Sequence, residues 1–233
     1  MCGIVGYVGP QQAAPILMEG LRRMEYRGYD SAGLAVLNGH GMQVHKAAGK
    51  LSVLADELEG QMPGGSLGIG HTRWATHGAA TTPNAHPHTD QSGRIALIHN
   101  GIIENANDIR KALAARGHVF DSETDTEVLA HLIGELYEGN LEEAVASALR
   151  DVDGAYGICV ISADEPDVLV AARNGSPIIL GIGDGEFLVA SDQSAIVEHT
   201  RSVIYLDNGE MAVLKREGSR VRTLTSRRAD KPI

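Results

Sequence analysis

The most reactive side chain near the start of the chain is the thiol of Cys2, in the opening sequence MCGIVGYVG. If Met1 is removed, Cys2 carries an α-amine with an ordinary pKa of about 7.7–8.0 and a thiol with an ordinary pKa of about 8.5. These two groups combine a nucleophile with its own general base on one residue. We expect Gly3 to leave space for an approaching substrate. Position alone favours the alternative, in which Cys2 is simply a small residue that suits removal of Met1.

A second candidate stretch, HTRWATHG at residues 71–78, follows an apolar run and enters a long polar segment. Arg73, at the end of the expected strand, is suited to bind a carboxylate through two parallel hydrogen bonds. Trp74 is the single tryptophan of the chain, and an amphipathic ring in a loop suits a lid over a site. The alternative is a surface arginine beside a packing tryptophan.

A third stretch, HNGIIEN at residues 99–105, places Asn100 directly before Gly101. The amide of an asparagine and the backbone N–H of the next glycine can point two donors at one spot, which is how an oxyanion hole is built. The alternative is a tight turn, because Asn-Gly is the dipeptide most favoured in two-residue hairpins.

Two further stretches carry charged groups. Asp125, in SETDTEV, falls in the first turn of an expected helix, where a carboxylate either compensates the helix dipole or accepts a substrate ammonium group. Thr124 and Glu127 form a capping-box pattern at the same helix start. Arg27, in YRGYDSAG, either lies near the nucleophile or pairs with Asp30.

Five of the ten histidines fall within residues 71–99. The pair His86 and His88, in HPH, resembles a metal-ligand pair. However, no carboxylate or cysteine stands at a diagnostic spacing from it, and the chain has no HExxH motif. We therefore expect these two histidines to order the surrounding loop, and we expect no metal.

The pattern of apolar residues predicts an α+β domain, because strands come first, then helices, then strands again. Short connections between successive strands favour antiparallel sheets. The expected helices span 12–26, 51–60, 105–118, 124–139 and 140–152. The expected strands span 2–8, 32–38, 42–48, 66–73, 94–100, 155–161, 167–173, 177–183, 186–191, 203–207 and 210–215. Between two strands, residues 74–93 form a long loop, which is usually functional or disordered in a domain of this kind.

Composition excludes several classes of protein. The net charge of −10 argues against a general nucleic-acid binder. No apolar run approaches the roughly 20 residues of a membrane span, and the first residues do not resemble a signal peptide, so a cytoplasmic location is expected. Of the two cysteines, Cys159 lies in an apolar run and is expected in the core. The basic segment from Lys215 is expected to be a solvated tail or linker.

Taken together, MCGIVGYVG, EYRGYDSAG, HTRWATHG, NAHPH, HNGIIEN and SETDTEV resemble, in order and spacing, the glutaminase domain of class II glutamine amidotransferases. Within this class the sequences HTRWATHG, HNGIIEN and SETDTEV most resemble those of the glutamine–fructose-6-phosphate aminotransferase family. The resemblance implies an α+β fold, a four-layer αββα sandwich of two antiparallel sheets, shared with other N-terminal-nucleophile hydrolases.

The resemblance also implies roles for the candidate residues, with L-glutamine as the substrate and no metal or cofactor. Cys2 is the nucleophile, and Asn100 with Gly101 forms the oxyanion hole. Arg73 binds the α-carboxylate of glutamine and Asp125 its α-ammonium group. The remaining implied substrate-binding residues are Trp74, Thr76 and His77 in a loop that closes over glutamine, and Arg27 and Gly28 around the nucleophile.

The resemblance covers residues 1–214, which we expect to be the glutaminase domain, and leaves residues 215–233 as a tail or the start of a linker. A second half, the sugar-isomerase domain, would be absent, and the full-length enzyme could form a homodimer. Three alternatives stay open: a glutaminase domain that serves another ammonia acceptor, a silent glutamine-binding domain, and a His-rich metal protein.

Overall fold

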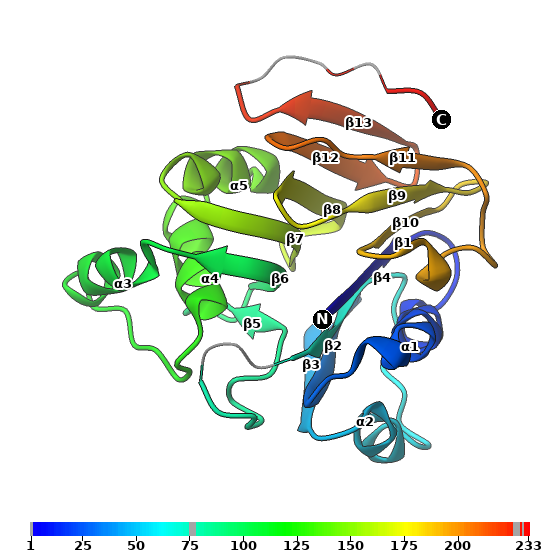
Figure 1. Cartoon of the computed structure of the whole chain (residues 1–233), viewed down its shortest axis with the longest axis horizontal. Coiled ribbons are helices and arrows are strands. Elements are labelled where there is room, and N and C mark those ends of the chain that lie inside the picture. The colour runs from blue at the N-terminus through cyan, green and yellow to red at the C-terminus, as the bar shows by residue number, and fades with distance from the viewer. Residues whose placement is uncertain (1, 75–77, 226–228, 230) are drawn as a thin grey trace.

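The computed structural model describes residues 2–74, 78–225, 229 and 231–233. Figure 1 shows two sheets that lie against each other, with helices on their outer faces. All strand pairs are antiparallel. The seven-stranded sheet has the order β11-β9-β10-β1-β4-β2-β3 and the six-stranded sheet the order β13-β12-β8-β7-β6-β5.

Most bounds follow the sequence pattern, but the strands at residues 88–89, inside the expected loop, and at residues 218–223 were not predicted. The seven-stranded sheet consists of β1 (Gly3–Val8), β2 (Ser31–Asn38), β3 (Gly41–Ala48), β4 (Leu67–Arg73), β9 (Ile179–Ile182), β10 (Phe187–Ala190) and β11 (Val203–Tyr205). The six-stranded sheet consists of β5 (His88–Thr89), β6 (Ile95–Ile103), β7 (Gly154–Ser162), β8 (Glu165–Asn174), β12 (Glu210–Lys215) and β13 (Gly218–Thr223). The helices are α1 (Ala13–Arg23), α2 (Leu51–Glu57), α3 (Ala106–Ala114), α4 (Asp125–Glu135) and α5 (Leu141–Arg150), with two short 3₁₀ turns, η1 (Glu25–Arg27) and η2 (Gln193–Ala195).

Three apolar layers separate these elements, which confirms the predicted four-layer αββα arrangement. One layer lies between the sheets, a second between the seven-stranded sheet and α1 and α2, and a third between the six-stranded sheet and α3, α4 and α5. The sequence of strand β7 is almost continuously apolar because both faces of the strand are buried. Ile158 and Val160 join the helix-facing layer, whereas Cys159 and Ile161 join the layer between the sheets.

The start of α4 follows the predicted cap in part. Thr124 is the N-cap, and its Oγ1 accepts a hydrogen bond from the N–H of Glu127 at 3.2 Å. The Glu127 carboxylate does not return to the Thr124 N–H, as a complete capping box requires. Instead it accepts from the N–H groups of Asp121 and Ser122, each at 2.8 Å. This carboxylate therefore fixes the segment that enters the helix, and with it the direction of α4.

The segment from residue 215 differs from the expected tail. Residues Gly218–Thr223 form β13, which pairs with β12 along its full length. Arg222 of β13 reaches α5, where its Nε lies 2.5 Å from Oε1 of Glu142. The basic charge that suggested a solvated linker is thus partly used in ion pairs that attach the last strand to a helix.

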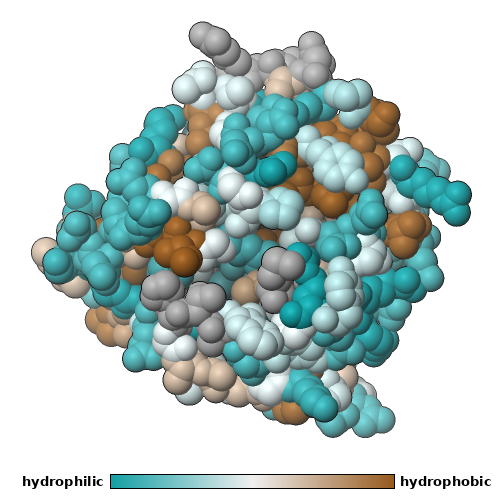
Figure 2. All heavy atoms as spheres, in the orientation of Figure 1, coloured by the Kyte–Doolittle hydropathy of each residue, from teal (hydrophilic) through white to brown (hydrophobic). Residues whose placement is uncertain are grey.

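On the face shown in Figure 2 hydrophilic side chains predominate, and a large apolar area lies where Figure 1 places β9, β11, β12 and β13. Within the part of the chain that the structure describes, no helix combines the length and the apolar character needed to cross a membrane.

Candidate active site

A small pocket forms where the start of β1 meets the end of β4. The antiparallel register pairs Gly3 with Thr72, so the preceding Cys2 lies beside Arg73 and Trp74. Strand β6 and the first residues of α4 complete the walls. The pocket has a volume of about 30 Å³, and its lining residues are Cys2, Arg73, Trp74, His86, His99, Gly101, Thr124, Asp125 and Thr126.

The Cys2 thiol is held by the backbone of Trp74. The Trp74 N–H donates to Sγ at 3.2 Å, and Sγ lies 3.6 Å from the Trp74 carbonyl oxygen. Burial raises the pKa of the thiol above its ordinary value, while the Trp74 N–H and the charge of Arg73 act in the opposite direction. The thiol therefore needs a base beside it to react near neutral pH.

Asn100 and Gly101 lie within a strand and not in a turn. They pair with Gly157 and Tyr156 of β7, and β6 continues to Ile103, so both the hairpin alternative and the expected strand end at residue 100 are wrong. The Asn100 Nδ2 donates to the Cys2 carbonyl oxygen at 3.2 Å. Gly101 adopts φ +136°, and a Cβ there would lie 2.0 Å from the Ala155 carbonyl oxygen, so only glycine fits.

Arg73 and Asp125 approach the pocket from different layers. Arg73, at the end of β4, is 5% exposed, and its Nη1 donates to the Ala79 carbonyl oxygen at 3.2 Å. Asp125 is the first residue of α4, and its Oδ2 accepts from the Ile103 N–H at 2.8 Å. This bond orients the carboxylate. Its other oxygen, Oδ1, lies 3.4 Å from Thr126 Oγ1 and can accept from a further donor as well. A cation and an anion thus both line the pocket that holds the thiol.

Trp74 lies over Gly28. A Cβ on Gly28 would lie 2.6 Å from a ring carbon of Trp74, and Gly28 has φ +73°. The absence of a side chain at this position therefore lets the indole settle against the backbone after η1. The ring stays half exposed, which fits a side chain at the mouth of a pocket.

Arg27 does not line the pocket. Its Nη1 lies 3.4 Å from Oγ of Ser191 and 3.9 Å from Oδ2 of Asp192. Arg27 thus contacts the segment after β10, where Asp192 is a carboxylate partner.

Two expected residues, Thr76 and His77, lie outside the described residues. The expectation for Gly3 is wrong. A Cβ on Gly3 would lie 2.7 Å from Thr72 Oγ1 and 2.9 Å from Met24 Cε, so Gly3 makes room for core side chains and not for a substrate.

More histidines lie at the pocket than the sequence predicted. His86, which we expected only to order the loop, lines the pocket, and its Nδ1 accepts from the His99 N–H at 3.4 Å. Burial lowers its pKa well below the ordinary value, so the ring is neutral and its proton resides on Nε2. His88 does order its surroundings, since its Nε2 lies 3.0 Å from Oγ1 of Thr124.

His99 and His71 are also neutral, because burial lowers the pKa of each, that of His71 to about 3. His99 Nδ1 lies 3.0 Å from Thr126 Oγ1, and its Nε2 lies 3.4 Å from the Ala155 carbonyl oxygen, which can only accept. Among the residues that the structure describes, no group of three or more His, Cys, Asp or Glu side chains is arranged to hold a metal ion.

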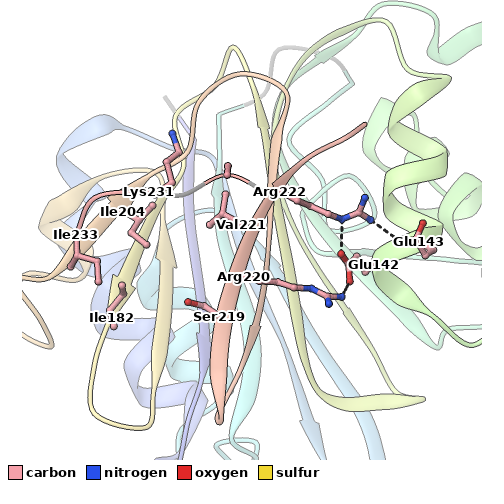
Figure 3. A pocket seen from close by; sticks show the side chains of 11 residues that line it. Glu142, Glu143, Ile182, Ile204, Ser219, Arg220, Val221, Arg222, Lys231 and Ile233 are labelled. Atoms are coloured by element: carbon pink, nitrogen blue, oxygen red, sulfur yellow. Dashed lines mark hydrogen bonds and ion pairs between the residues drawn. The ribbon is translucent and has the colours of Figure 1, made fainter. Parts of the chain in front are cut away.

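A much larger cavity, of about 740 Å³, lies between β13, α5 and the final residues of the chain and shares no lining residue with the Cys2 pocket. Figure 3 shows that two arginines and two glutamates of the lining face one another, since Arg220 and Arg222 both reach Glu142, and Arg222 also reaches Glu143. Among the described residues, this cavity therefore contains paired charges, apolar side chains and the Ser219 hydroxyl, but no thiol.

Comparison with known proteins identifies the family. The model of the glutamine amidotransferase domain family matches residues 43–222, which is more than half of the chain. The chain is 55% identical to the glutamine–fructose-6-phosphate aminotransferase (isomerizing) of Chlorobaculum tepidum, over 96% of this chain and 38% of that protein. The corresponding protein of Thermus thermophilus is 56% identical over 97% of this chain and 37% of its own length. The chain thus spans less than two fifths of these relatives.

Solved structures show the same fold. Glutamine phosphoribosylpyrophosphate amidotransferase from B. subtilis superposes with a TM-score of 0.83 at 28% identity, covering 97% of this chain and 50% of that one. A glutamine aminotransferase class-II domain protein from Silicibacter pomeroyi has a TM-score of 0.62 at 16% identity, covering 95% of this chain and 99% of that one, and this likeness concerns the fold alone. The chain belongs to the class II glutamine amidotransferase family and is homologous to part of the glutamine–fructose-6-phosphate aminotransferase enzymes.

Proposed function

We propose that this chain hydrolyses the side-chain amide of L-glutamine to glutamate and ammonia, with Cys2 as the nucleophile. The observation that carries this proposal is the meeting of Cys2, Gly101, Arg73 and Asp125 around one pocket, with Asn100 bonded to the Cys2 backbone. These residues come from separate elements, and together they offer a nucleophile, oxyanion donors, a cation and an anion. This is the set that an α-amino acid amide requires.

The first half of the reaction forms a thioester. With Met1 removed, the α-amine of Cys2 takes the thiol proton, and the thiolate attacks the side-chain carbonyl carbon of glutamine, forming a carbon–sulfur bond. The carbon–nitrogen bond then breaks, and the protonated amine gives its proton to the leaving ammonia. In the second half water attacks the γ-glutamyl thioester, the amine again accepts a proton, and glutamate leaves as the thiol is restored.

Charge stabilisation comes from Asn100 and Gly101. The oxygen of the tetrahedral intermediate becomes negative and accepts hydrogen bonds from the Asn100 amide and the Gly101 N–H, each worth about 3–4 kcal/mol by analogy with other oxyanion holes. Because these donors are positioned before the reaction, little reorganisation accompanies the attack.

Specificity for glutamine comes from its two charged ends. Arg73 pairs with the α-carboxylate and Asp125 with the α-ammonium group, and a ligand that lacks either end forgoes the corresponding ion pair. Trp74, Thr76 and His77 belong to the segment that closes over the substrate. Gly28 supports this segment through its contact with Trp74, and Arg27 supports the surroundings of the nucleophile.

The names of the relatives support a proposal for the ammonia acceptor. Proteins named glutamine–fructose-6-phosphate aminotransferase (isomerizing) match nearly the whole of this chain, so ammonia released here would serve to convert fructose 6-phosphate to glucosamine 6-phosphate. A sugar-isomerase domain would carry out that step. In such a full-length enzyme, the glutaminase domain would include β13 in addition to residues 1–214, the residues after Thr223 would lead to the isomerase, and a cytoplasmic homodimer is expected.

Glutamate release from glutamine by the purified chain tests the proposal, with intact mass measured on the same sample to report Met1. We expect turnover when Met1 is absent, and Cys2→Ala should abolish turnover while glutamine still binds. Binding without turnover in a sample that lacks Met1 would identify a silent glutamine-binding domain and contradict the proposal. Appreciable hydrolysis by Cys2→Ala would show that the nucleophile is another residue.

A further inference from the structure

The side-chain amide of Asn100 is held at both ends. Its Nδ2 donates to the Cys2 carbonyl oxygen at 3.2 Å, and its Oδ1 lies 2.9 Å from Nε2 of His71. His71 comes from β4, in the seven-stranded sheet, whereas Asn100 comes from β6, in the six-stranded sheet. The contact therefore crosses from one sheet to the other beside the nucleophile.

The chemistry of the two groups assigns the proton. An amide oxygen only accepts hydrogen bonds, so the Nε2 of His71 carries the hydrogen. Burial keeps this ring neutral, and its Nδ1 is therefore an acceptor. That Nδ1 is buried and has no hydrogen-bond partner among the described residues. The side-chain hydrogen bond of the ring thus goes to Asn100, and the backbone of His99 also acts on the ring.

The His71 ring is fixed in position. It is fully buried and stacks on the ring of His86, with centroids 4.2 Å apart and planes 19° apart. His86 is in turn bonded to the His99 backbone, at the residue before Asn100. The donor that faces Asn100 therefore has a defined direction.

We infer that His71 is a positioning residue that determines which end of the Asn100 amide faces the reacting carbonyl oxygen. The inference rests on the proposed function. The two ends of an asparagine amide are almost equal in size, so packing alone does not distinguish them. Because the His71 N–H donates, it forms a hydrogen bond only with the amide orientation that places Oδ1 toward the imidazole and Nδ2 toward Cys2. In the reverse orientation an amide oxygen would face the developing oxyanion and repel it.

A pair of amide substitutions tests this role. In His71→Gln the side-chain nitrogen reaches the position of Nε2 and restores the donor, whereas in His71→Asn it ends near the position of Nδ1 and does not. We expect His71→Asn to lower kcat for glutamine hydrolysis by about 10- to 100-fold with KM changed less than about twofold, and His71→Gln to retain most of the activity. Equal kcat values for the two variants would overturn the inference.

Two further readouts separate positioning from structural support. Alkylation of Cys2 by iodoacetamide forms no oxyanion, so its rate should be the same in His71→Asn and the unmodified chain. In a double-mutant cycle, His71→Asn should add no loss to Asn100→Ala, because the residue that it positions is already gone. If the alkylation rate of His71→Asn fell as much as its kcat, or if the losses in kcat of His71→Asn and Asn100→Ala were additive, His71 would only support the fold. Either result would overturn the inference.

The matched control is His131→Gln, which removes another buried histidine that does not line the pocket. It should leave kcat unchanged, and a loss equal to that of His71→Asn would count against a specific role of His71. Absence of turnover in the unmodified chain without Met1 would contradict the proposed function itself, whereas the outcomes above contradict only the role of His71.

Discussion

Asn84 and Glu123 form a reciprocal pair of hydrogen bonds beside the pocket. The Asn84 Nδ2 donates to Glu123 Oε2 at 3.1 Å, and the Glu123 N–H donates to Asn84 Oδ1 at 3.0 Å. The N–H of Ala79 also lies 3.4 Å from the same carboxylate oxygen. Arg73 donates to the Ala79 carbonyl oxygen, and Asp125 follows Glu123 by two residues. The Asn84–Glu123 pair therefore joins the segment that holds Arg73 to the segment that carries Asp125.

Glu123→Ala should therefore weaken glutamine binding more than it slows the chemical step. We expect KM for glutamine to rise about tenfold, because misplacing a binding group that does not touch the reacting atoms costs binding and alignment, while kcat falls less than about threefold. Steady-state glutamate release measures both. Glu138→Ala, at an exposed glutamate after α4, is the control and should change neither. A lower kcat with an unchanged KM would show that Glu123 acts on the chemical step instead.

Gly28→Ala should displace Trp74. The new Cβ would lie 2.6 Å from the indole, and the residue would have to hold φ +73°. Because Trp74 is the single tryptophan, its fluorescence reports the displacement directly, and we expect a shifted emission maximum together with a higher KM for glutamine. Gly39→Ala, at a glycine whose added Cβ meets nothing within 4 Å, is the control. An unchanged spectrum in Gly28→Ala would contradict the contact.

Stability should fall as pH drops below about 6.5. Burial lowers the pKa of His71 to about 3 and holds those of His86, His88 and His99 below the ordinary value. Below about pH 6.5 the unfolded chain therefore binds protons that the folded chain does not bind. The contribution of the neutral histidines to the unfolding free energy is complete above that pH and is lost toward pH 3. Each such histidine contributes up to about 1.4 kcal/mol per pH unit within its window.

Urea unfolding between pH 7.5 and pH 5 measures this effect, in a range above that in which carboxylates titrate. The unfolding free energy should decrease steadily, and His71→Gln should reduce the slope by about one proton. A constant free energy across this range would contradict the assignment of neutral, buried imidazoles.

Glu142→Ala should destabilise the chain by about 3 kcal/mol, because the buried Arg222 loses its buried carboxylate partner and keeps the more exposed Glu143. Arg220→Ala removes a second contact to the same glutamate, but Arg220 is largely exposed, so about 1 kcal/mol or less is expected. Thermal or urea unfolding of the two variants, with glutaminase activity measured in parallel, checks the difference. Equal losses would show that the burial of Arg222 does not matter.

Much of the fold could be predicted because its signals are local. The Thr124 cap, the apolar spacing of α1 and the alternating or continuous apolar runs of the strands depend on neighbours within a few residues, since helices and strands repeat over short distances. The order of the motifs also pointed to the family that the comparisons identify. Strand β13 could not be predicted, because a basic sequence is equally compatible with a solvated tail. The ion pair of Arg222 with Glu142, which lies far away in the sequence, becomes evident only in the tertiary structure.

By itself, the sequence determined which residues could act: a thiol at position 2, an Asn-Gly pair, an arginine, and an aspartate at a helix start. Only the tertiary structure decided how they are held. It placed Asn100 and Gly101 inside a strand, turned Gly3 toward Met24, and set His71 against Asn100 across two sheets. The physical reason is that hydrogen-bond partners and steric neighbours are chosen by packing between elements far apart in the chain, and local propensity carries no information about them.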